Sequence, residues 1–526
     1  MKRTGRTIDR IAAAVLLAGI ASLHSTCEAR AESPAGENEV LEAAEKVTPT
    51  VEEIAQQLWD LAEVSLLEIK SSAYLKDVLT RNGFAITSEK TAGVPTAFIA
   101  EYGKGEPKLG ILLEYDALPG LGNEPVPERQ PRKDGVTSGH GCGHNLIGAG
   151  AMGAALAIKN LMVANDVPGT LRVYGAAAEE SEGAKVFMAR EGAFDDLDAM
   201  LHWHPMDVAH VSKVRLAATT HMYVEFKGKA AHAGLYPWKG RSALDAVEIL
   251  LHSVNMMREH VEPTARIHYI ITDGGKAPNI VPDRAVVMLT YRDADRERVN
   301  AGIAWIKDMV EGAGLATQTE GLAIDYFGMH DLLPNTPLAD RMHKHFKTVG
   351  LPEYTTEENA FATELQNASG LEPTGMAAQV GPIPDEPRLG GFTDVGDVSY
   401  ITPTMGVTVP SMPQGIPLHS WMATACHGHS IGFKAAVTAS KVLTLTGIDL
   451  LTDAELLEQV KADFDERTEG FTYESPIPDT IKEPSGLPDE MRRYGTRAQL
   501  KATILNNTGD HGLAPHSHGT GAPHTH

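Results

Sequence analysis

The chain has 526 residues, of which 42% are hydrophobic and 22% charged. This composition is typical of a globular protein, and the length allows more than one domain around a large buried core. The formal net charge of -23 at pH 7 argues against nucleic acid as a partner, because phosphate binding needs a basic surface. We therefore expect a soluble, acidic enzyme.

The N-terminus has the pattern of a secretory signal peptide. Basic residues in the first ten positions precede an apolar run over residues 11–23, and Ala29-Arg30-Ala31 follows as a small-x-small cleavage signal. A membrane anchor is the alternative, but it needs about 20 apolar residues and this run is shorter. We expect residues 1–31 to be removed, which predicts a periplasmic or secreted protein without a membrane span.

Short apolar runs of strand length alternate with helical patterns in the first part of the chain. We expect strands over residues 97–102, 109–113, 171–178 and 199–203, with a helix of small residues between the second and the third. This order predicts an α/β catalytic domain with a mainly parallel, mixed sheet, in which functional residues lie beyond the carboxyl ends of the strands. The polar pairs at or just beyond the ends of these runs are Glu114 and Asp116, Glu179 and Glu180, and His202 and His204.

A glycine-rich stretch, Ser138-Gly-His-Gly-Cys-Gly-His-Asn145, places one thiol and two imidazoles before the helix of small residues. Glycines allow the tight turns that bring neighbouring side chains to one point, and thiolate and imidazole are ligands that zinc and similar ions favour. The mature chain would keep only Cys142 and Cys426, so a disulfide between them is the alternative. We interpret the stretch as a metal loop.

The pattern changes after residue 216 to strand, helix, strand, strand and helix. This order is typical of a ferredoxin-like α+β insertion. We expect a catalytic domain in two parts, with the insertion between them and a C-terminal extension that ends in a disordered, histidine-rich tail. The expected ranges are 45–215 and 321–450 for the catalytic domain, 216–320 for the insertion and 451–526 for the extension.

The adjacent glutamates Glu179 and Glu180 are a second signal for metal. Two neighbouring carboxylates in a partly buried site repel each other unless cations compensate them. We infer that one of the pair coordinates metal and that the other takes a proton from the attacking water. A solvated acidic stretch at the start of a helix is the alternative for this motif alone. His202 and His204 face the same way if the strand persists, so the spacing leaves the choice between them open.

Together these motifs resemble the di-metal aminoacylase and carboxypeptidase family. The motifs are Gly-His-Gly-Cys-Gly-His-Asn, Ala-Glu-Glu-Ser-Glu-Gly-Ala, Trp-His-Pro and Pro-Leu-His-Ser-Trp, in this order within residues 47–445. The similarity is greatest to the amidohydrolase branch that contains indole-acetyl-amino-acid hydrolases, hippurate hydrolase and the B subunit of aminobenzoyl-glutamate hydrolase. The resemblance implies two divalent metal ions, zinc or manganese, held by Cys142, His144, Glu180, His204 and His419, with Glu179 as the general base.

The resemblance also assigns residues of the insertion. It implies that His232 and Asn279 help to hold the reacting carbonyl, and that the insertion acts as a lid and as the interface of a homodimer. We also expect Arg292, which the resemblance does not assign, to bind the carboxylate of the substrate. Asp397 matches a loop residue with a supporting role.

Two positions depart from the family pattern. Glu114 stands where other branches have a metal-binding histidine, two residues before Asp116, and Asn145 stands where nearer relatives have aspartate. We therefore do not expect Glu114 or Asp116 to be ligands, and we expect Cys142 to hold much of the first ion.

The function that the resemblance implies is hydrolysis of the amide bond in N-acyl or N-aroyl amino acids, of the aminobenzoyl-glutamate kind. The products would be a carboxylic acid and a free amino acid. One alternative is a dipeptidase or carboxypeptidase that uses the same ions. Another is a non-catalytic protein, either the partner of a related second subunit or a metal-binding protein of the cell envelope.

Overall fold

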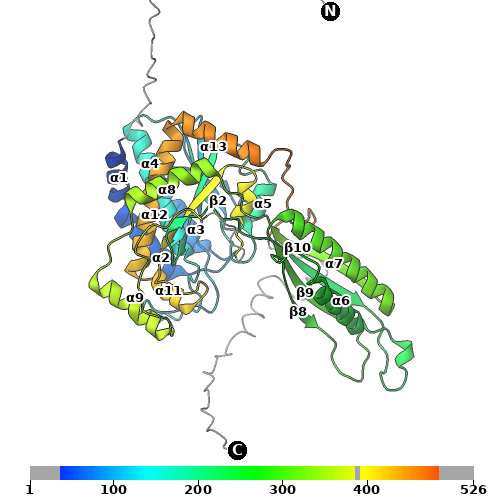
Figure 1. The fold of residues 1–526 in the computed structure, drawn as a ribbon. Helices are drawn as coiled ribbons and strands as arrows, with labels where there is room; N and C mark the ends of the chain where they lie inside the picture. The colour runs from blue at the N-terminus through cyan, green and yellow to red at the C-terminus, as the bar shows by residue number, and fades with distance from the viewer. Residues whose placement is uncertain (1–35, 385–390, 485–526) are drawn as a thin grey trace, which may run out of the picture. The chain divides into compact units, whose positions relative to one another are not determined.

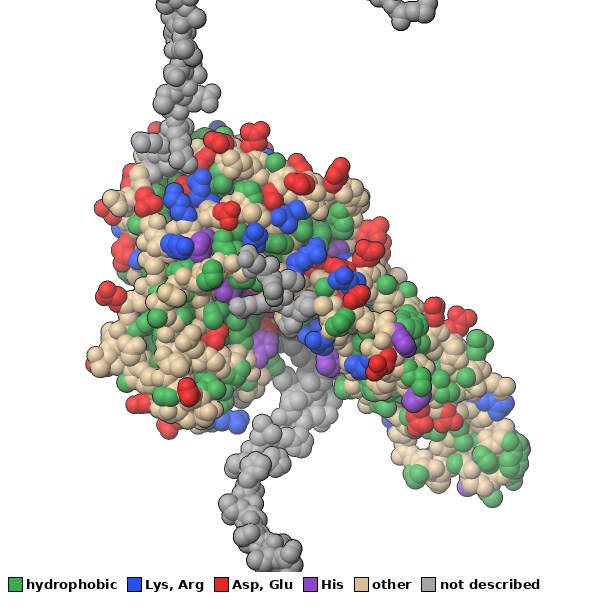
Figure 2. Space-filling view, viewed as in Figure 1, with side chains coloured by type: hydrophobic (Ala, Val, Ile, Leu, Met, Phe, Trp, Pro, Cys, Tyr) green, Lys and Arg blue, Asp and Glu red, His purple; other side chains and the backbone are tan. Residues whose placement is uncertain are grey.

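Two β-sheets organise the chain (Figure 1). The computed structural model describes residues 36–384 and 391–484, so the expected signal peptide and the histidine-rich tail lie outside the described residues. The larger sheet has seven strands in the order β1-β2-β4-β3-β5-β11-β6, and the smaller sheet has four in the order β10-β7-β9-β8. Acidic and basic side chains are interspersed on the face shown in Figure 2.

The larger sheet is parallel at its centre. Strand β3 lies between β4 and β5, and β11 follows β5, all in parallel pairs, whereas β1, β2 and β6 form antiparallel edges. Every residue of β11 is buried, as expected where helices cover both faces of a parallel sheet. The strands are β1 (Ala85–Glu89), β2 (Phe98–Lys104), β3 (Lys108–Leu113), β4 (Gly169–Gly175), β5 (Ala199–Met206), β6 (His210–Val211) and β11 (Thr404–Pro410).

Helices α4 and α12 pack closely in the core of this domain. A Cβ at Gly150 of α4 would lie 2.8 Å from the carbonyl oxygen of Ala436 and 2.9 Å from Nε1 of Trp203, so glycine is what allows this approach. Both helices are long and apolar enough to cross a membrane, but 83% and 78% of their apolar windows are buried inside the protein. The helices are α1 (Glu37–Lys46), α2 (Thr48–Leu61), α3 (Ile69–Arg81), α4 (His144–Ala164), α5 (Ala184–Arg190), α8 (Thr336–Val349), α9 (Thr356–Ala368), α10 (Val395–Ser399), α11 (Trp421–His427), α12 (Ser430–Thr452) and α13 (Ala454–Arg467).

The insertion has the order β-α-β-β-α-β and a separate hydrophobic core. Helices α6 and α7 lie side by side in Figure 1 and pack on the antiparallel sheet. The predicted fold class, a mainly parallel mixed sheet with an inserted ferredoxin-like domain, is therefore confirmed. The elements are β7 (Ala218–Lys227), α6 (Ala243–Met257), β8 (Arg266–Asp273), β9 (Arg284–Asp293), α7 (Arg296–Thr317) and β10 (Glu320–Met329).

The structure differs from the expected ranges at two places. Strand β10 runs past residue 320 to Met329, and only its last three residues are fully buried, so it lacks a strong apolar pattern. The start of the C-terminal extension packs on the catalytic domain, because α13 contacts α8 and Ile477 and Ile481 are buried. The guanidinium of Arg190 donates to two carbonyl groups of this segment.

Candidate metal centre

The predicted metal loop lies directly before helix α4. Gly143 is the N-cap of this helix with a φ of +86°, which glycine adopts without strain. A Cβ at Gly143 would lie 2.7 Å from Cγ of Pro205, and a Cβ at Gly141 would lie 3.2 Å from Cα of His419. The two glycines therefore bring Cys142 against the segments that carry Pro205 and His419.

Further candidate side chains follow strands of the larger sheet and lie near Cys142. Strands β4 and β5 run parallel to β3 on either side of it. Glu179 and Glu180 follow β4, His204 lies near the end of β5, and Glu114 follows β3 directly. The candidate residues thus gather at the carboxyl ends of parallel strands, as expected for an α/β sheet.

The five ligands that the family resemblance implies come together in two groups. The ligand atoms of Cys142, His144 and His204 lie within 4.8 Å of one another, and so do those of Cys142, Glu180 and His419. Within the groups, Sγ of Cys142 lies 3.4 Å from Nε2 of His204, and Nε2 of His419 lies 3.4 Å from Oε2 of Glu180. Cys142 belongs to both groups, which is the arrangement that two neighbouring ions with one shared ligand would need.

Asp116 orients one ligand of each group. Its Oδ1 lies 2.8 Å from Nδ1 of His144, and its Oδ2 accepts the backbone N–H of Glu180 at 3.0 Å and the hydroxyl of Ser65 at 2.7 Å. Burial alone would raise the pKa of Asp116, but the facing His144 outweighs burial and holds this pKa below its usual range. A carboxylate behind a histidine fixes the tautomer that leaves Nε2 for a metal ion.

The residues present fit a divalent cation. Nε2 of His144 is buried without a hydrogen-bond partner in the described part of the chain. Carboxylate oxygens of Glu114, Glu179 and Glu180 approach this nitrogen at 3.5, 3.8 and 3.9 Å. Burial opposes protonation of His144, yet Asp116 and Cys142 raise its pKa well above the usual value; the surroundings of this ring therefore favour a positive charge, which a metal ion would supply in place of the proton. A thiol, imidazoles and carboxylates around such a nitrogen form a donor set that suits a divalent transition-metal ion.

His204 and His202 have different surroundings. The Nδ1 of His204 faces the carbonyl oxygen of Pro205 at 2.7 Å, which leaves Nε2 toward Cys142. Burial, together with the nearby His144, lowers the pKa of His204 to about 4, so the ring is neutral at pH 7, as a metal ligand must be. His202 instead packs over Gly406, where a Cβ would lie 2.5 Å from its ring, and belongs to neither ligand group among the described residues.

Glu179 lies beside the ligand groups without belonging to either. Burial and the nearby carboxylates of Glu114 and Asp394 raise its pKa well above the usual value. Residue Ala178, directly before it, has a φ of +55°, and its N–H donates to the buried carboxylate of Glu68 at 2.9 Å. Glu68 therefore holds the turn that presents Glu179.

Three buried charged residues of this centre were not singled out from the sequence. They are Glu68, Lys185 and Asp394, and each has a relative exposure of 0%. Lys185 lies five positions after Glu180 in a helix that is otherwise mostly apolar. A charged residue in such a stretch was the one feature of the sequence that pointed to it. Glu68 and Asp394 are contributed by distant parts of the chain and carry no local motif.

His232 and Asn279 lie on neighbouring loops of the insertion. The carbonyl oxygen of Asn279 accepts the N–H of Ala233 at 3.0 Å, and Nδ1 of His232 accepts two backbone N–H groups, which leaves its Nε2 outward. A surface hollow of 590 Å³ lies beside His232, and hydrophobic side chains gather at this end of the insertion in Figure 2. Within the described residues, neither His232 nor Asn279 bonds to a member of the metal centre.

Arg292 lies near the end of β9, with its guanidinium 4.4 Å from the ring centre of Phe392. Its Nε is buried without a hydrogen-bond partner among the described residues, and burial lowers its pKa below the usual range. His221 packs against the ring of Phe327. A Cβ at Gly183, three positions after Glu180, would lie 3.0 Å from the Phe327 ring. Arg292 is thus a cation without an ion pair among the described residues.

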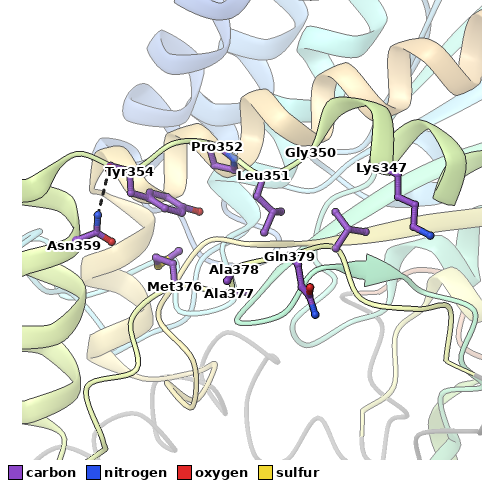
Figure 3. A pocket seen from close by; sticks show the side chains of 11 residues that line it. Lys347, Gly350, Leu351, Pro352, Tyr354, Asn359, Met376, Ala377, Ala378 and Gln379 are labelled. Atoms are coloured by element: carbon purple, nitrogen blue, oxygen red, sulfur yellow. Dashed lines mark hydrogen bonds between the residues drawn. The ribbon is translucent and has the colours of Figure 1, made fainter.

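A second surface hollow, of 530 Å³, contains none of the candidate residues (Figure 3). The amide of Asn359 there donates to the carbonyl oxygen of Tyr354 at 3.2 Å. Its lining is mostly neutral and includes Lys347, Leu351, Tyr354, Asn359, Met376 and Gln379. The metal centre, with its converging ligands, is the stronger candidate for the active site.

Comparisons with known proteins agree with this fold. Residues 218–317, which form most of the insertion, match the peptidase dimerisation domain. A solved structure of a dinuclear metal-binding peptidase from the M20 family, from Bacillus subtilis, superposes with a TM-score of 0.53 at 16% sequence identity. The superposition covers 77% of this chain and 99% of that one.

Sequence relatives identify the family. The B subunit of p-aminobenzoyl-glutamate hydrolase from Escherichia coli (strain K12) is 34% identical over 456 residues, which cover 82% of this chain and 95% of that protein. The Xaa-Arg dipeptidase of Mus musculus is 28% identical over 464 residues, which cover 82% of this chain and 94% of that protein. Fold and relatives define a metal-dependent hydrolase of amide bonds. The chain belongs to the M20 peptidase family, which confirms the resemblance drawn from the motifs.

Proposed function

We propose that the protein hydrolyses the amide bond of an N-aroyl or N-acyl amino acid, of the p-aminobenzoyl-glutamate kind, at two divalent ions. The observation that carries this proposal is the pair of ligand groups that share Cys142, with Glu179 beside them. Zinc and manganese both suit this mixture of sulfur, nitrogen and oxygen ligands. The relative from Escherichia coli supports the choice of substrate.

The side chains of the centre divide the work of hydrolysis. When bound, the ions would polarise the scissile carbonyl and make the attacking water more acidic. Glu179, which is outside both ligand groups, takes the proton of that water and then delivers it to the leaving amine. Asp116 keeps His144 in the tautomer that binds metal.

The insertion is proposed to complete the site. Nε2 of His232 is free of the loop hydrogen bonds that occupy Nδ1, so it is available to donate to the oxyanion, with Asn279 beside it. This step needs closure of the insertion over the substrate. Arg292, which forms no ion pair among the described residues, would bind the substrate carboxylate in a bidentate manner.

We also propose that the protein is a homodimer, or pairs with a related second subunit. Strand β8 is an edge of the smaller sheet and exposes Ile270 and Ile271, while the neighbouring helix α6 exposes Met256. Unpaired backbone groups and apolar side chains on an edge strand favour pairing with another chain. The match of residues 218–317 to a dimerisation domain supports the insertion as the part of the chain that forms the interface.

A dipeptidase is the second candidate function. The relative from Mus musculus is named for the dipeptides that it cleaves, and Arg292 suits the terminal carboxylate of a dipeptide equally well.

We propose export to the periplasm or beyond as the location. Fractionation of cells that make the full chain or residues 32–526 tests this, because only the full chain should leave the cytoplasm.

A panel of substrates tests the proposed function. The purified, metal-loaded protein is assayed with p-aminobenzoyl-glutamate, hippurate, N-acetyl amino acids and Xaa-Arg dipeptides. The proposal expects the highest kcat/KM on an aroyl or acyl amino acid. A dipeptide as the best substrate would support the second candidate, and no turnover of any amide would overturn both.

A further inference from the structure

A buried lysine lies beside the metal centre. Nζ of Lys185 is 2.7 Å from Oε1 of Glu114 and 2.5 Å from Oδ1 of Asp394, and its backbone N–H donates to Oδ2 of Asp394 at 3.0 Å. All three side chains are buried. An ammonium taken out of water without partners is strongly unfavourable, so this charge is held in place by the two carboxylates.

Glu114 faces the metal centre with its second oxygen. Oε2 of Glu114 lies 3.5 Å from Nε2 of His144, the nitrogen that is left for an ion. Its other oxygen is bound to Lys185. The contact with Lys185 holds Oε1 away from the ligand groups and restrains the carboxylate of Glu114 from turning toward an ion.

Three carboxylates lie close to Nε2 of His144. Oxygens of Glu179 and Glu180 lie 3.8 and 3.9 Å from Nε2 of His144, in addition to Glu114, yet only Glu180 belongs to a ligand group among the described residues. Lys185 is the lysine that pairs with Glu114 among the described residues; without it, a metal ion bound at His144 would attract this carboxylate. The carboxylate would then turn toward the ion and crowd Glu179.

We propose that Lys185 is a positioning residue of the metal centre, which holds Glu114 outside the ligand set so that Glu179 remains next to the ions as an uncoordinated base. The inference rests on the proposed di-metal centre. It accounts for a buried cation between two carboxylates that do not themselves belong to a ligand group.

Cobalt(II) binding tests the inference without an activity assay. The full chain is stripped of metal with a chelator and titrated with Co²⁺, and the visible absorption reports the coordination number and the thiolate ligand. Glu114→Gln should keep the wild-type spectrum and stoichiometry, because Glu114 is not a ligand. Lys185→Met should bind Co²⁺ about tenfold more tightly and with weaker visible absorption, because an oxygen ligand is added. The double variant with Glu114→Gln should return to the wild-type spectrum.

The control is Lys434→Met, which removes a lysine paired with Glu358 elsewhere in the fold and should leave the spectrum unchanged. An altered spectrum in Glu114→Gln would show that Glu114 is a ligand and would overturn the inference, even if Lys185→Met does not fold. A wild-type spectrum and affinity in folded Lys185→Met would also overturn it. No cobalt binding by the wild-type protein would overturn the di-metal centre and the inference together, whereas the two preceding outcomes overturn the inference alone.

Discussion

The carboxylate of Asp116 lies 2.8 Å from Nδ1 of His144 and, through its other oxygen, accepts the backbone N–H of Glu180 at 3.0 Å. His144 and Glu180 belong to different ligand groups. A single buried side chain therefore orients one ligand in each half of the proposed metal centre. The effect of Asp116 on the metal affinity of both halves can be measured.

Asp116→Asn should weaken the binding of both ions by about 10- to 100-fold, the range found when a partner behind a metal ligand is removed. The amide can accept only one of the two N–H groups and offers an N–H of its own to the other. Calorimetric titration of metal-stripped protein with Zn²⁺ measures the effect, and Asp60→Asn, at an exposed position of α2, is the control. Unchanged affinity at both sites would show that Asp116 does not orient the ligands.

Cys142 and His419 should differ in their effect on metal content, because only Cys142 belongs to both ligand groups. Cys142→Ser should reduce the content of both ions, while His419→Ala should remove about one equivalent and spare the other. Elemental analysis after dialysis against a defined Zn²⁺ concentration distinguishes the two patterns. Equal losses in both variants would argue against a shared thiolate.

The stability of the catalytic domain should depend on pH through Asp397. Burial raises the pKa of Asp397 to about 7, although the backbone N–H of His330 and the hydroxyl of Tyr473 both bond to its carboxylate. Between about pH 4 and pH 7 the unfolded chain loses this proton while the folded protein keeps it. Folded-state stability therefore falls as pH rises through this window, at up to about 1.4 kcal/mol per pH unit.

Asp397→Asn removes this titration. The free energy of unfolding of the variant, relative to wild type, should rise between pH 4 and pH 7 and stay level above pH 8. Urea unfolding of metal-stripped protein at a series of pH values measures the difference, with Asp479→Asn, at an exposed position, as the control. Parallel curves for wild type and Asp397→Asn would contradict the raised pKa.

Ile270→Lys should dissociate the proposed dimer, because it places a charge on the exposed edge strand β8, where Ile270 has a relative exposure of 60%. Sedimentation velocity measures the change in mass. Leu315→Lys is the matched control, since Leu315 is also exposed but lies at the end of α7, next to the opposite edge strand β10. A dimer that survives Ile270→Lys and dissociates in Leu315→Lys would move the interface to that other edge.

The sequence predicted the ligands that lie next to a recognisable local pattern. Cys142 and His144 are flanked by glycines, and Glu180 and His204 follow apolar runs of strand length, so each could be found from its neighbours. The spacing alone left His202 and His204 equivalent. Only the family resemblance favoured His204, and the structure brings His204 near Cys142.

The charged residues behind the ligands had no such pattern. Lys185 stands in a mostly apolar stretch, but nothing beside it in the sequence points to its partner Asp394, which lies 209 positions away. Glu68 bonds to the N–H of Ala178 across 110 positions. Contacts of this kind depend on how the sheet and helices pack, so hydrophobic periodicity does not predict them.

Glu179 is proposed to act as a base beside two ions that it does not bind. The most direct measurement is hydrolysis of p-aminobenzoyl-glutamate by metal-stripped wild type and Glu179→Gln as Zn²⁺ or Mn²⁺ is added, with bound metal determined on the same samples. We predict that wild-type activity appears as the second equivalent binds, and that Glu179→Gln binds two equivalents but loses at least about 100-fold in kcat, the lower end for removal of a general base. Full turnover by Glu179→Gln, or full wild-type activity without metal, would contradict the account.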